Sequence, residues 1–329
     1  MELSEKEQSI LTRATRAEIV RSRGPKPSLS PREPTEVFVQ REPARRGEVV
    51  EVATLFLTGA ECPFACSMCD LWKHTLDTAT KPGDLIAQVE VGLASLPPTP
   101  WIKLYNASNF FDPRAVPDAD RLEIGRRVAS LDRVIVENHP RLLDRERVLR
   151  FRDRLQGKLE IAMGLETVHP FAMQVLNKQM HPRDLECAMG WLQEEGIDGR
   201  AFVLLQPPGV SPDEAIASLI ETVQFAANAG VRHISVIPTR RGNPWLDRLI
   251  VDGLYQLPTL EALEISLQRC LEQFPEQVIV ADTWDWSSIP GQCGQCSETR
   301  LRRMEQVNLD QNWCELDEVI ACRCTEVMS

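Results

Sequence analysis

Short apolar runs recur along the chain from about residue 49 and alternate with longer segments of helical spacing. Most runs are continuously apolar, which is typical of parallel strands covered on both faces. Strand and helix alternate about six times, so the pattern predicts an α/β fold with a parallel sheet in an open, partial barrel. The predicted strands are Val52–Leu57, Trp101–Tyr105, Arg133–Val136, Leu159–Gly164, Ala201–Leu205 and His233–Ile237.

Helix boundary signals support this alternation. Residues 211–214 read Ser-Pro-Asp-Glu, a capping box with proline at the first helical position, and predict a helix that runs to Gly230. A second helix is predicted over Pro182–Glu195, before a glycine. A helix over Leu260–Phe274 and a strand over Val278–Asp282 then precede a cysteine-rich tail.

The first fifty residues differ from the rest of the chain. They contain ten basic and eight acidic residues, whereas the whole chain has a net charge of −11. Their prolines disfavour regular structure, so we expect a short helix over 8–22 and an extended arm over 23–48. The arm is either solvated or faces a substrate or partner. The expected domains are an arm (1–48), a barrel (49–260) and a C-terminal extension (261–329).

Composition limits the function classes. With 329 residues and 43% hydrophobic residues, the chain can bury a large core. Its acidity argues against nucleic-acid binding through a general basic surface. We find neither an apolar run long enough for a transmembrane helix nor an N-terminal signal, so we expect a cytoplasmic protein without a membrane partner. In a reducing compartment, clustered cysteines are better interpreted as metal ligands than as disulfides.

Three cysteines follow the first predicted strand with the spacing C-x3-C-x2-C: Cys62, Cys66 and Cys69. Active sites of β/α barrels gather at the C-terminal ends of the strands. A [4Fe–4S] cluster normally takes four cysteines, so three would leave one iron open, as catalysis requires. The alternative is a zinc knuckle with a distant fourth ligand.

This pattern resembles the radical SAM superfamily, apart from Met68, where many members have an aromatic residue. The resemblance implies a partial (β/α)6 radical SAM barrel with a small cysteine-rich C-terminal extension. It also implies a [4Fe–4S] cluster whose open iron holds the amino and carboxylate groups of S-adenosylmethionine (SAM). One electron, from a flavodoxin or ferredoxin-like donor, cleaves SAM to methionine and a 5′-deoxyadenosyl radical, which takes a hydrogen atom from the substrate.

The resemblance also implies residues that bind SAM. Asn106 and Ser108 lie in the loop after the second strand, where the family holds the SAM amino group, and Glu137 ends the third strand. In the branch with the coproporphyrinogen oxidases and the elongator catalytic subunit, Glu166 corresponds to a ribose contact and Lys178 to a carboxylate contact. From the residues alone, Glu137 could instead cap a helix, and Glu166 and Lys178 could be exposed surface charges. No catalytic residue is assigned.

Most of residues 35–324 resemble the archaeosine-biosynthesis radical SAM family more closely. The shared features are Phe-x-Asp-Pro after strand two, Gly-Leu-Glu-Thr ending strand four and Leu-x-Pro-Pro ending strand five. The resemblance implies tRNA modification: a partner subunit attaches lysine to a 7-deazaguanine base, and a lyase step leaves an amidine. Residues 106–109 depart from the Ser-Gly-Ser turn of related members. The alternatives are a small-molecule substrate or a non-catalytic zinc-binding interaction module.

A second cysteine group lies in the tail and combines CxxC with CxC. Four thiolates suit a closed zinc site or an auxiliary iron–sulfur cluster, and reduced thiols are the third interpretation. Cys314 is either a fifth ligand or part of the core. The four predicted ligands are Cys293, Cys296, Cys322 and Cys324.

A few further residues have two interpretations. His74 either faces the substrate or lies on the surface, and the Arg240-Arg241 loop either binds an anionic group or is solvated. Cys187 and Cys270 fall on predicted helices and are expected to be small buried residues.

Overall fold

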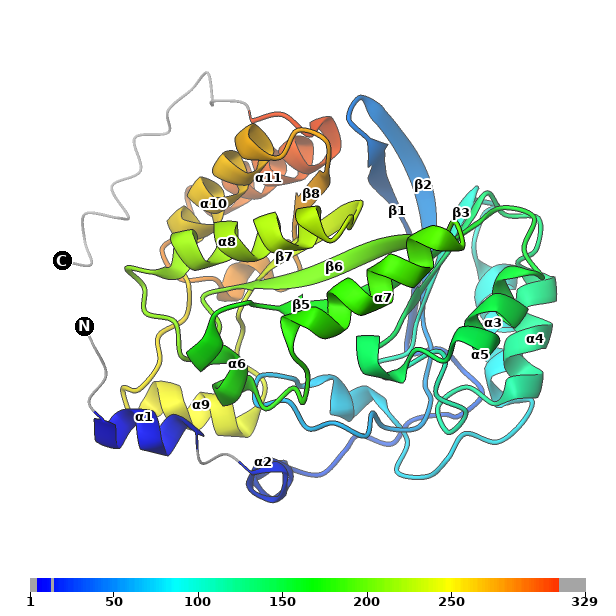
Figure 1. Ribbon diagram of the computed structural model, residues 1–329, viewed down its shortest axis with the longest axis horizontal. Helices are drawn as coiled ribbons and strands as arrows, with labels where there is room; N and C mark the ends of the chain where they lie inside the picture. Colours follow the sequence, from blue (N-terminus) through cyan, green and yellow to red (C-terminus); the bar gives the residue numbers. More distant parts are fainter. Residues whose placement is uncertain (1–4, 13–14, 314–329) are drawn as a thin grey trace.

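The computed structural model describes residues 5–12 and 15–313, and its centre is one sheet of eight strands that curves into an incomplete barrel (Figure 1). The strands neighbour one another in chain order; β1 pairs antiparallel with β2, and every later pair is parallel. The strands are β1 (Glu36–Arg45), β2 (Glu48–Phe56), β3 (Trp101–Tyr105), β4 (Arg133–Glu137), β5 (Lys158–Glu166), β6 (Asp198–Leu205), β7 (His233–Pro238) and β8 (Val278–Ala281).

Helices between the parallel strands cover the outside of the sheet (Figure 1). Each crossover is long enough to hold a helix, as parallel pairing requires. The α-helices are α1 (Glu5–Thr12), α2 (Arg16–Ser22), α3 (Asp84–Ser95), α4 (Asp118–Arg127), α5 (Arg145–Arg152), α6 (Pro170–Leu176), α7 (Pro182–Glu194), α8 (Ala215–Asn228), α9 (Pro244–Val251), α10 (Leu260–Gln273) and α11 (Ser297–Asp310). The 3-10 turns are η1 (Leu71–His74), η2 (Pro140–Leu142) and η3 (Trp286–Ser288).

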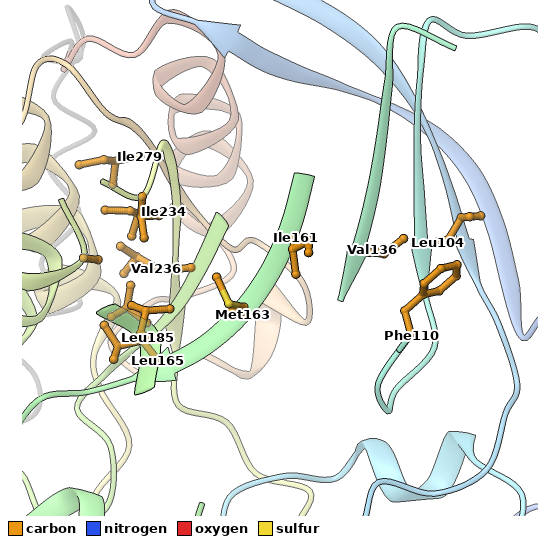
Figure 2. Close-up of a cluster of buried hydrophobic side chains, with 14 of the residues drawn as sticks. Leu104, Phe110, Val136, Ile161, Met163, Leu165, Leu185, Ile234, Val236 and Ile279 are labelled. Carbon is orange, nitrogen blue, oxygen red and sulfur yellow. The ribbon is translucent and has the colours of Figure 1, made fainter. Parts of the chain in front are cut away.

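The main hydrophobic core lies between the sheet and these helices. It confirms the predicted α/β barrel, because the apolar runs supply one buried face to the helices and one face to the barrel interior. Figure 2 shows part of this core, with buried side chains along the strands from β3 to β8. The labelled side chains are Leu104, Phe110, Val136, Ile161, Met163, Leu165, Leu185, Ile234, Val236 and Ile279.

Both flanking segments add a strand to the sheet. The predicted extended arm ends in β1, which forms a hairpin with β2 through a turn at Gly47, a residue with a φ of 78°. The sequence analysis did not predict β1, because Pro43 interrupts its strand pattern. The pairing with β2 is irregular between Pro43 and Arg45. At the other edge, β8 pairs with β7, so the cysteine-rich extension begins inside the barrel sheet.

Three local expectations differ from the structure. The helix predicted over 8–22 is two helices, since Thr15 and Glu18 form a capping box that starts α2. The helix expected from residue 212 begins at Ala215, although the Ser211 hydroxyl does donate to Glu214. Cys187 is exposed on α7, whereas Cys270 is buried as expected. Within the described residues, no helix is both long and apolar enough to cross a membrane.

Candidate functional site

A cavity of about 1560 Å³ opens at the C-terminal ends of the parallel strands. All three cysteines of the C-x3-C-x2-C loop line it, and each is partly accessible. The ends of β4 and β5 and the segment after α6 supply charged groups to the same cavity: Glu137, Glu166 and Lys178. The barrel therefore brings the first predicted cysteine group and the predicted SAM residues together.

Hydrogen bonds to the end of α6 hold the middle of the cysteine loop. The Ser67 amide donates to the Leu176 carbonyl at 2.9 Å, and the Ser67 hydroxyl donates to the Val175 carbonyl at 2.8 Å. The Asn177 side chain donates to the Ala65 carbonyl at 3.1 Å. Ser67 lies between two of the cysteines, so these bonds fix the loop against the barrel.

Two asparagines that the sequence analysis missed also hold the loop. Asn109 Nδ2 donates to Cys62 Sγ at 3.3 Å, while its Oδ1 accepts from the His139 amide at 2.7 Å. Asn243 Nδ2 donates to the Cys69 carbonyl at 2.7 Å. Asn109 lies in the loop that we assigned to SAM, and Asn243 follows the two arginines. Their position after strand ends was a signal, but only the fold shows which cysteine each contacts.

Burial favours the thiol form of these cysteines. It raises the pKa of Cys66 to about 12 and raises the pKa of Cys62, while the charge of Lys178 lowers both. A bound metal would therefore displace protons from the loop. Across the described part of the chain, no three His, Cys, Asp or Glu side chains are arranged to hold one metal ion. A four-iron cluster is larger than one ion, so its thiolates lie further apart.

Glu137 holds the turn after β3. Its Oε1 accepts from the Asn106 amide at 2.6 Å, and Ala107, between Asn106 and Ser108, has a φ of 50°. Burial raises the pKa of Glu137 to about 7, although hydrogen bonds from the amides of this turn lower it. The Ser108 hydroxyl is buried and has no hydrogen-bond partner among the described residues. Glu137 is thus tied to the loop predicted to hold the SAM amino group.

Glu166 and Lys178 form a buried ion pair with 2.6 Å between Oε1 and Nζ. Both side chains are less than a tenth exposed, so the interpretation as exposed surface charges is wrong. Burial lowers the pKa of Lys178, but the Glu166 carboxylate more than reverses this, and the pKa is raised overall. At Gly164 a Cβ would overlap Glu166 Oε1 and Lys178 Nζ, so a side chain there would displace the ion pair.

Five aromatic rings form a continuous belt along the cavity wall. Neighbouring ring centroids in this belt lie 6.0 to 6.4 Å apart. The rings come from β1, β2, β3, β6 and the segment after β8, so they join opposite edges of the sheet. The aromatic belt consists of Phe38, Phe56, Tyr105, Phe202 and Trp284.

The mouth of the cavity contains the other polar residues that were singled out. His74 is exposed and contributes to the lining. Arg240 also lines the cavity, and it is paired with Asp282 at 2.8 Å. Arg241 is more than half exposed and lies 3.8 Å from Asp247. The arginine loop is thus partly neutralised by carboxylates.

The second cysteine group is only partly within the described residues. Cys293 Sγ and Cys296 Sγ are 3.7 Å apart, just before α11. Cys314, Cys322 and Cys324 lie outside the described residues. A metal site in the tail therefore stays a prediction.

Comparison with known proteins identifies solved structures with a similar fold. No protein-family model matches the chain. The Elp3 protein of the archaeon Methanocaldococcus infernus, with an N-terminal deletion, superposes with a TM-score of 0.50 at 12% identity, over 68% of this chain and 58% of that one. Coproporphyrinogen III oxidase from Escherichia coli, a radical SAM enzyme, gives 0.39 at 13% identity, over 52% and 39%. This chain shares its fold with that archaeal Elp3 protein.

Two further relatives are more similar in sequence. The queuine lyase from Clostridium spiroforme, solved with SAM and queuine, is 18% identical with a TM-score of 0.44, over 60% of this chain and 80% of that one. An uncharacterized protein of Methanocaldococcus jannaschii is 23% identical over 236 residues, which is 69% of this chain and 64% of that protein. The chain thus spans less than two-thirds of that relative's length. In the fold observed here, the cysteine loop follows the first parallel strand, β2.

Proposed function

We propose that this protein is a radical SAM enzyme whose Cys62–Cys69 loop holds a [4Fe–4S] cluster. One observation carries the proposal: the three cysteines and the buried Glu166–Lys178 pair face a single cavity at the C-terminal ends of the strands. Active sites of β/α barrels occupy this end. A buried ion pair inside a cavity is also a group that structural packing alone does not require.

The residues around the loop fit both cofactors. Three cysteines leave one iron open for the amino and carboxylate groups of SAM, and the unpartnered Ser108 hydroxyl can accept from the amino group. Lys178 offers a positive charge to the carboxylate, and Glu166 offers acceptors to ribose hydroxyls. Glu137 keeps the Ser108 loop in place through the Asn106 amide.

A cluster bound here supplies the electron that splits SAM and so begins hydrogen abstraction from the substrate. The chain itself would orient the bound SAM and exclude water. Asn109 donates to Cys62 Sγ, which stabilises negative charge on that sulfur. A flavodoxin or ferredoxin-like protein in the cytoplasm is the proposed electron donor.

For the substrate, we propose a planar heteroaromatic base such as the 7-deazaguanine implied by the family resemblance, altered by a lyase-type step. The aromatic belt supports this choice, because aromatic faces stack on flat rings. The proposal has two forms: the substrate is either the free base or the same base within tRNA. Arg23, Lys26 and Arg240 are held in ion pairs with carboxylates and are less available to tRNA phosphates, which favours a free base.

The first experiment tests cofactor chemistry. Anaerobic reconstitution with iron and sulfide, followed by dithionite and SAM, should release 5′-deoxyadenosine from the wild type and not from Cys66→Ala. Cys187→Ala is the matched control, since Cys187 is exposed on α7 and should leave release unchanged. Zinc without iron after anaerobic purification, and no SAM cleavage, would instead support the non-catalytic zinc-binding module.

The tail is proposed to hold a second metal site with a structural role. Cys293 and Cys296 lie close enough to serve as two of its four thiolate ligands. Cys322 and Cys324 would supply the other two ligands, around zinc or an auxiliary iron–sulfur cluster. Metal analysis of Cys293→Ser against wild type distinguishes these two: the variant should lose either zinc or the additional iron.

A further inference from the structure

Residues 15–35 contact the cysteine loop and the segment that follows it. We propose that this segment is a strap that clamps both ends of the Cys62–Cys69 loop, with Arg23 and Lys26 as its positioning residues. The strap would hold the loop in its ligand-binding shape and limit access of solvent to a bound cluster. Only the protection of the cluster rests on the proposed function; the clamping of the loop does not.

The first contact is at Glu61, which directly precedes Cys62. Arg23 Nη1 lies 2.6 Å from one Glu61 carboxylate oxygen, and Lys26 Nζ lies 2.7 Å from the other. The Arg23 side chain is 8% exposed and that of Lys26 is 15% exposed. Two cations from the strap therefore share one carboxylate, and they do so largely out of water.

The second contact is beyond Cys69, at the other end of the loop. The Arg23 guanidinium lies 5.0 Å from the ring centroid of Trp72, which is buried. Lys26 Nζ donates to Thr75 Oγ1 at 3.2 Å and pairs with Asp77 at 2.8 Å. The same two cations thus connect the residue before the first cysteine to the segment after the third.

The strap itself is anchored on both sides of these cations. On the N-terminal side, Ile19 of α2 is fully buried, and α2 lies against α9. On the C-terminal side, Gln88 donates to the Pro31 carbonyl at 2.7 Å, and the Thr35 amide donates to the Phe56 carbonyl at 2.8 Å. Because the strap is anchored, its contacts can restrict the motion of the loop, whereas the contacts of a free arm cannot.

These contacts reduce the conformations open to the loop before any metal binds. Part-buried charged hydrogen bonds and a cation–π contact are each stronger than exposed pairs. A loop whose two ends are held loses less conformational entropy when three cysteines converge on one ligand. The basic residues of the N-terminal segment, which the sequence assigned to solvent or to a partner, thereby serve the cluster loop of the same chain.

Hydrogen exchange of the apoprotein tests the clamp without any cofactor. In Arg23→Ala/Lys26→Ala, amides of residues 61–75 should exchange about tenfold faster than in wild type, because the loop ends open more often. Arg23→Lys with Lys26 intact should recover part of the protection. Arg32→Ala is the matched control: Arg32 lies in the same segment but pairs with Asp84 of α3 at 3.2 Å. The Arg32→Ala variant should leave the exchange rates of the amides of residues 61–75 unchanged.

Loss of iron to a chelator tests protection of the cluster. The double variant, once reconstituted, should lose its visible absorbance several-fold faster than wild type and Arg32→Ala. The strap proposal would be refuted if the double variant exchanged the amides of residues 61–75 at the wild-type rate. It would also be refuted if Arg32→Ala accelerated this exchange as much as the double variant does. A wild type that holds no cluster would refute the proposed function, while faster exchange of residues 61–75 in the double variant would still support the clamp.

Discussion

The Glu166–Lys178 pair, which we propose contacts SAM, is also a buried contact on which the stability of the fold depends. Its two charges lie 2.6 Å apart within the cavity, and each is held by the other. His139 Nε2 lies 3.2 Å from the backbone carbonyl oxygen of Lys178. The His139 ring also packs on Phe64 of the cysteine loop. A SAM molecule would therefore meet a pair that is already ordered.

Replacing Lys178 with Met should destabilise the fold by about 3–5 kcal/mol, because Glu166 is left as an uncompensated buried charge. Urea unfolding measures this effect. Glu166→Gln/Lys178→Met should regain much of the stability but still bind SAM at least about tenfold more weakly, since the positive charge is missing. Lys158→Met, at the exposed start of β5, is the control. Full SAM binding by the double variant would exclude Lys178 from the SAM site.

Sequence reasoning identified these side chains but not their partners. The family resemblance assigned Glu166 and Lys178 to SAM, whereas from the residues alone they could also have been exposed surface charges. Sequence reasoning missed Asn109 and Asn243, since an asparagine after a strand is usually a turn residue. Their contacts with Cys62 and Cys69 join loops 47 and 174 residues apart, a distance over which local pattern carries no information.

The start of α9 is coupled to the cysteine loop through Asn243. Its Oδ1 caps the helix by accepting from the Trp245 amide at 2.9 Å, and its Nδ2 donates to the Cys69 carbonyl. The side chain is fully buried. The Asn243 side chain thus caps α9 and also fixes the position of the third cysteine, Cys69.

Asn243→Ala should lower the free energy of unfolding by about 2 kcal/mol, from a lost cap and a lost buried hydrogen bond. Asn243→Ser keeps a capping oxygen but lacks the amide group that donates to Cys69, so it should be more stable than Asn243→Ala yet retain equally little iron. Urea unfolding and iron analysis after reconstitution measure the two effects. Thr259→Ala, which removes the cap of α10 away from the loop, should cost about 1 kcal/mol and leave iron unchanged. Normal iron in both Asn243 variants would contradict the coupling.

Across the whole molecule, a buried charge network fills the N-terminal half of the barrel. Glu160 of β5 is fully buried and pairs with Arg133 at 2.7 Å, Arg200 at 2.8 Å and Arg232 at 2.9 Å. Arg200 also reaches Glu42 of β1 at 3.3 Å, and Glu42 pairs with Lys103 of β3. Five strands and the residue before β7 therefore share one network, and the strand predicted least well, β1, supplies one of its two central carboxylates.

This network predicts how stability depends on pH. Burial raises the pKa of Glu160, but the guanidinium groups of Arg200, Arg232 and Arg133 outweigh it and hold the pKa well below the ordinary 4.5. The stabilisation is thus complete above about pH 4.5 and is lost as the pH falls toward the folded-state pKa.

Glu160→Gln should cost about 3–5 kcal/mol at pH 7, because three arginines lose their buried partner. Its difference from wild type should narrow below pH 4.5, because the unfolded wild-type chain then binds a proton at Glu160 while the folded protein keeps this carboxylate charged. Urea midpoints measured from pH 3 to 8 check this, with the exposed Glu51→Gln as control. A difference that stays constant with pH would show that Glu160 acts through packing instead of charge.

The sequence by itself determined the parallel α/β barrel, the cysteine loop after its first parallel strand and the charged residues at the strand ends. These features follow from local periodicity and spacing, which neighbouring residues carry. Only the tertiary structure decided that β1 and β8 complete the sheet, that Glu166 pairs with Lys178 and that the basic arm contacts Glu61 and Trp72. Such contacts join segments far apart in the chain, and their free energy depends on burial that no local window contains.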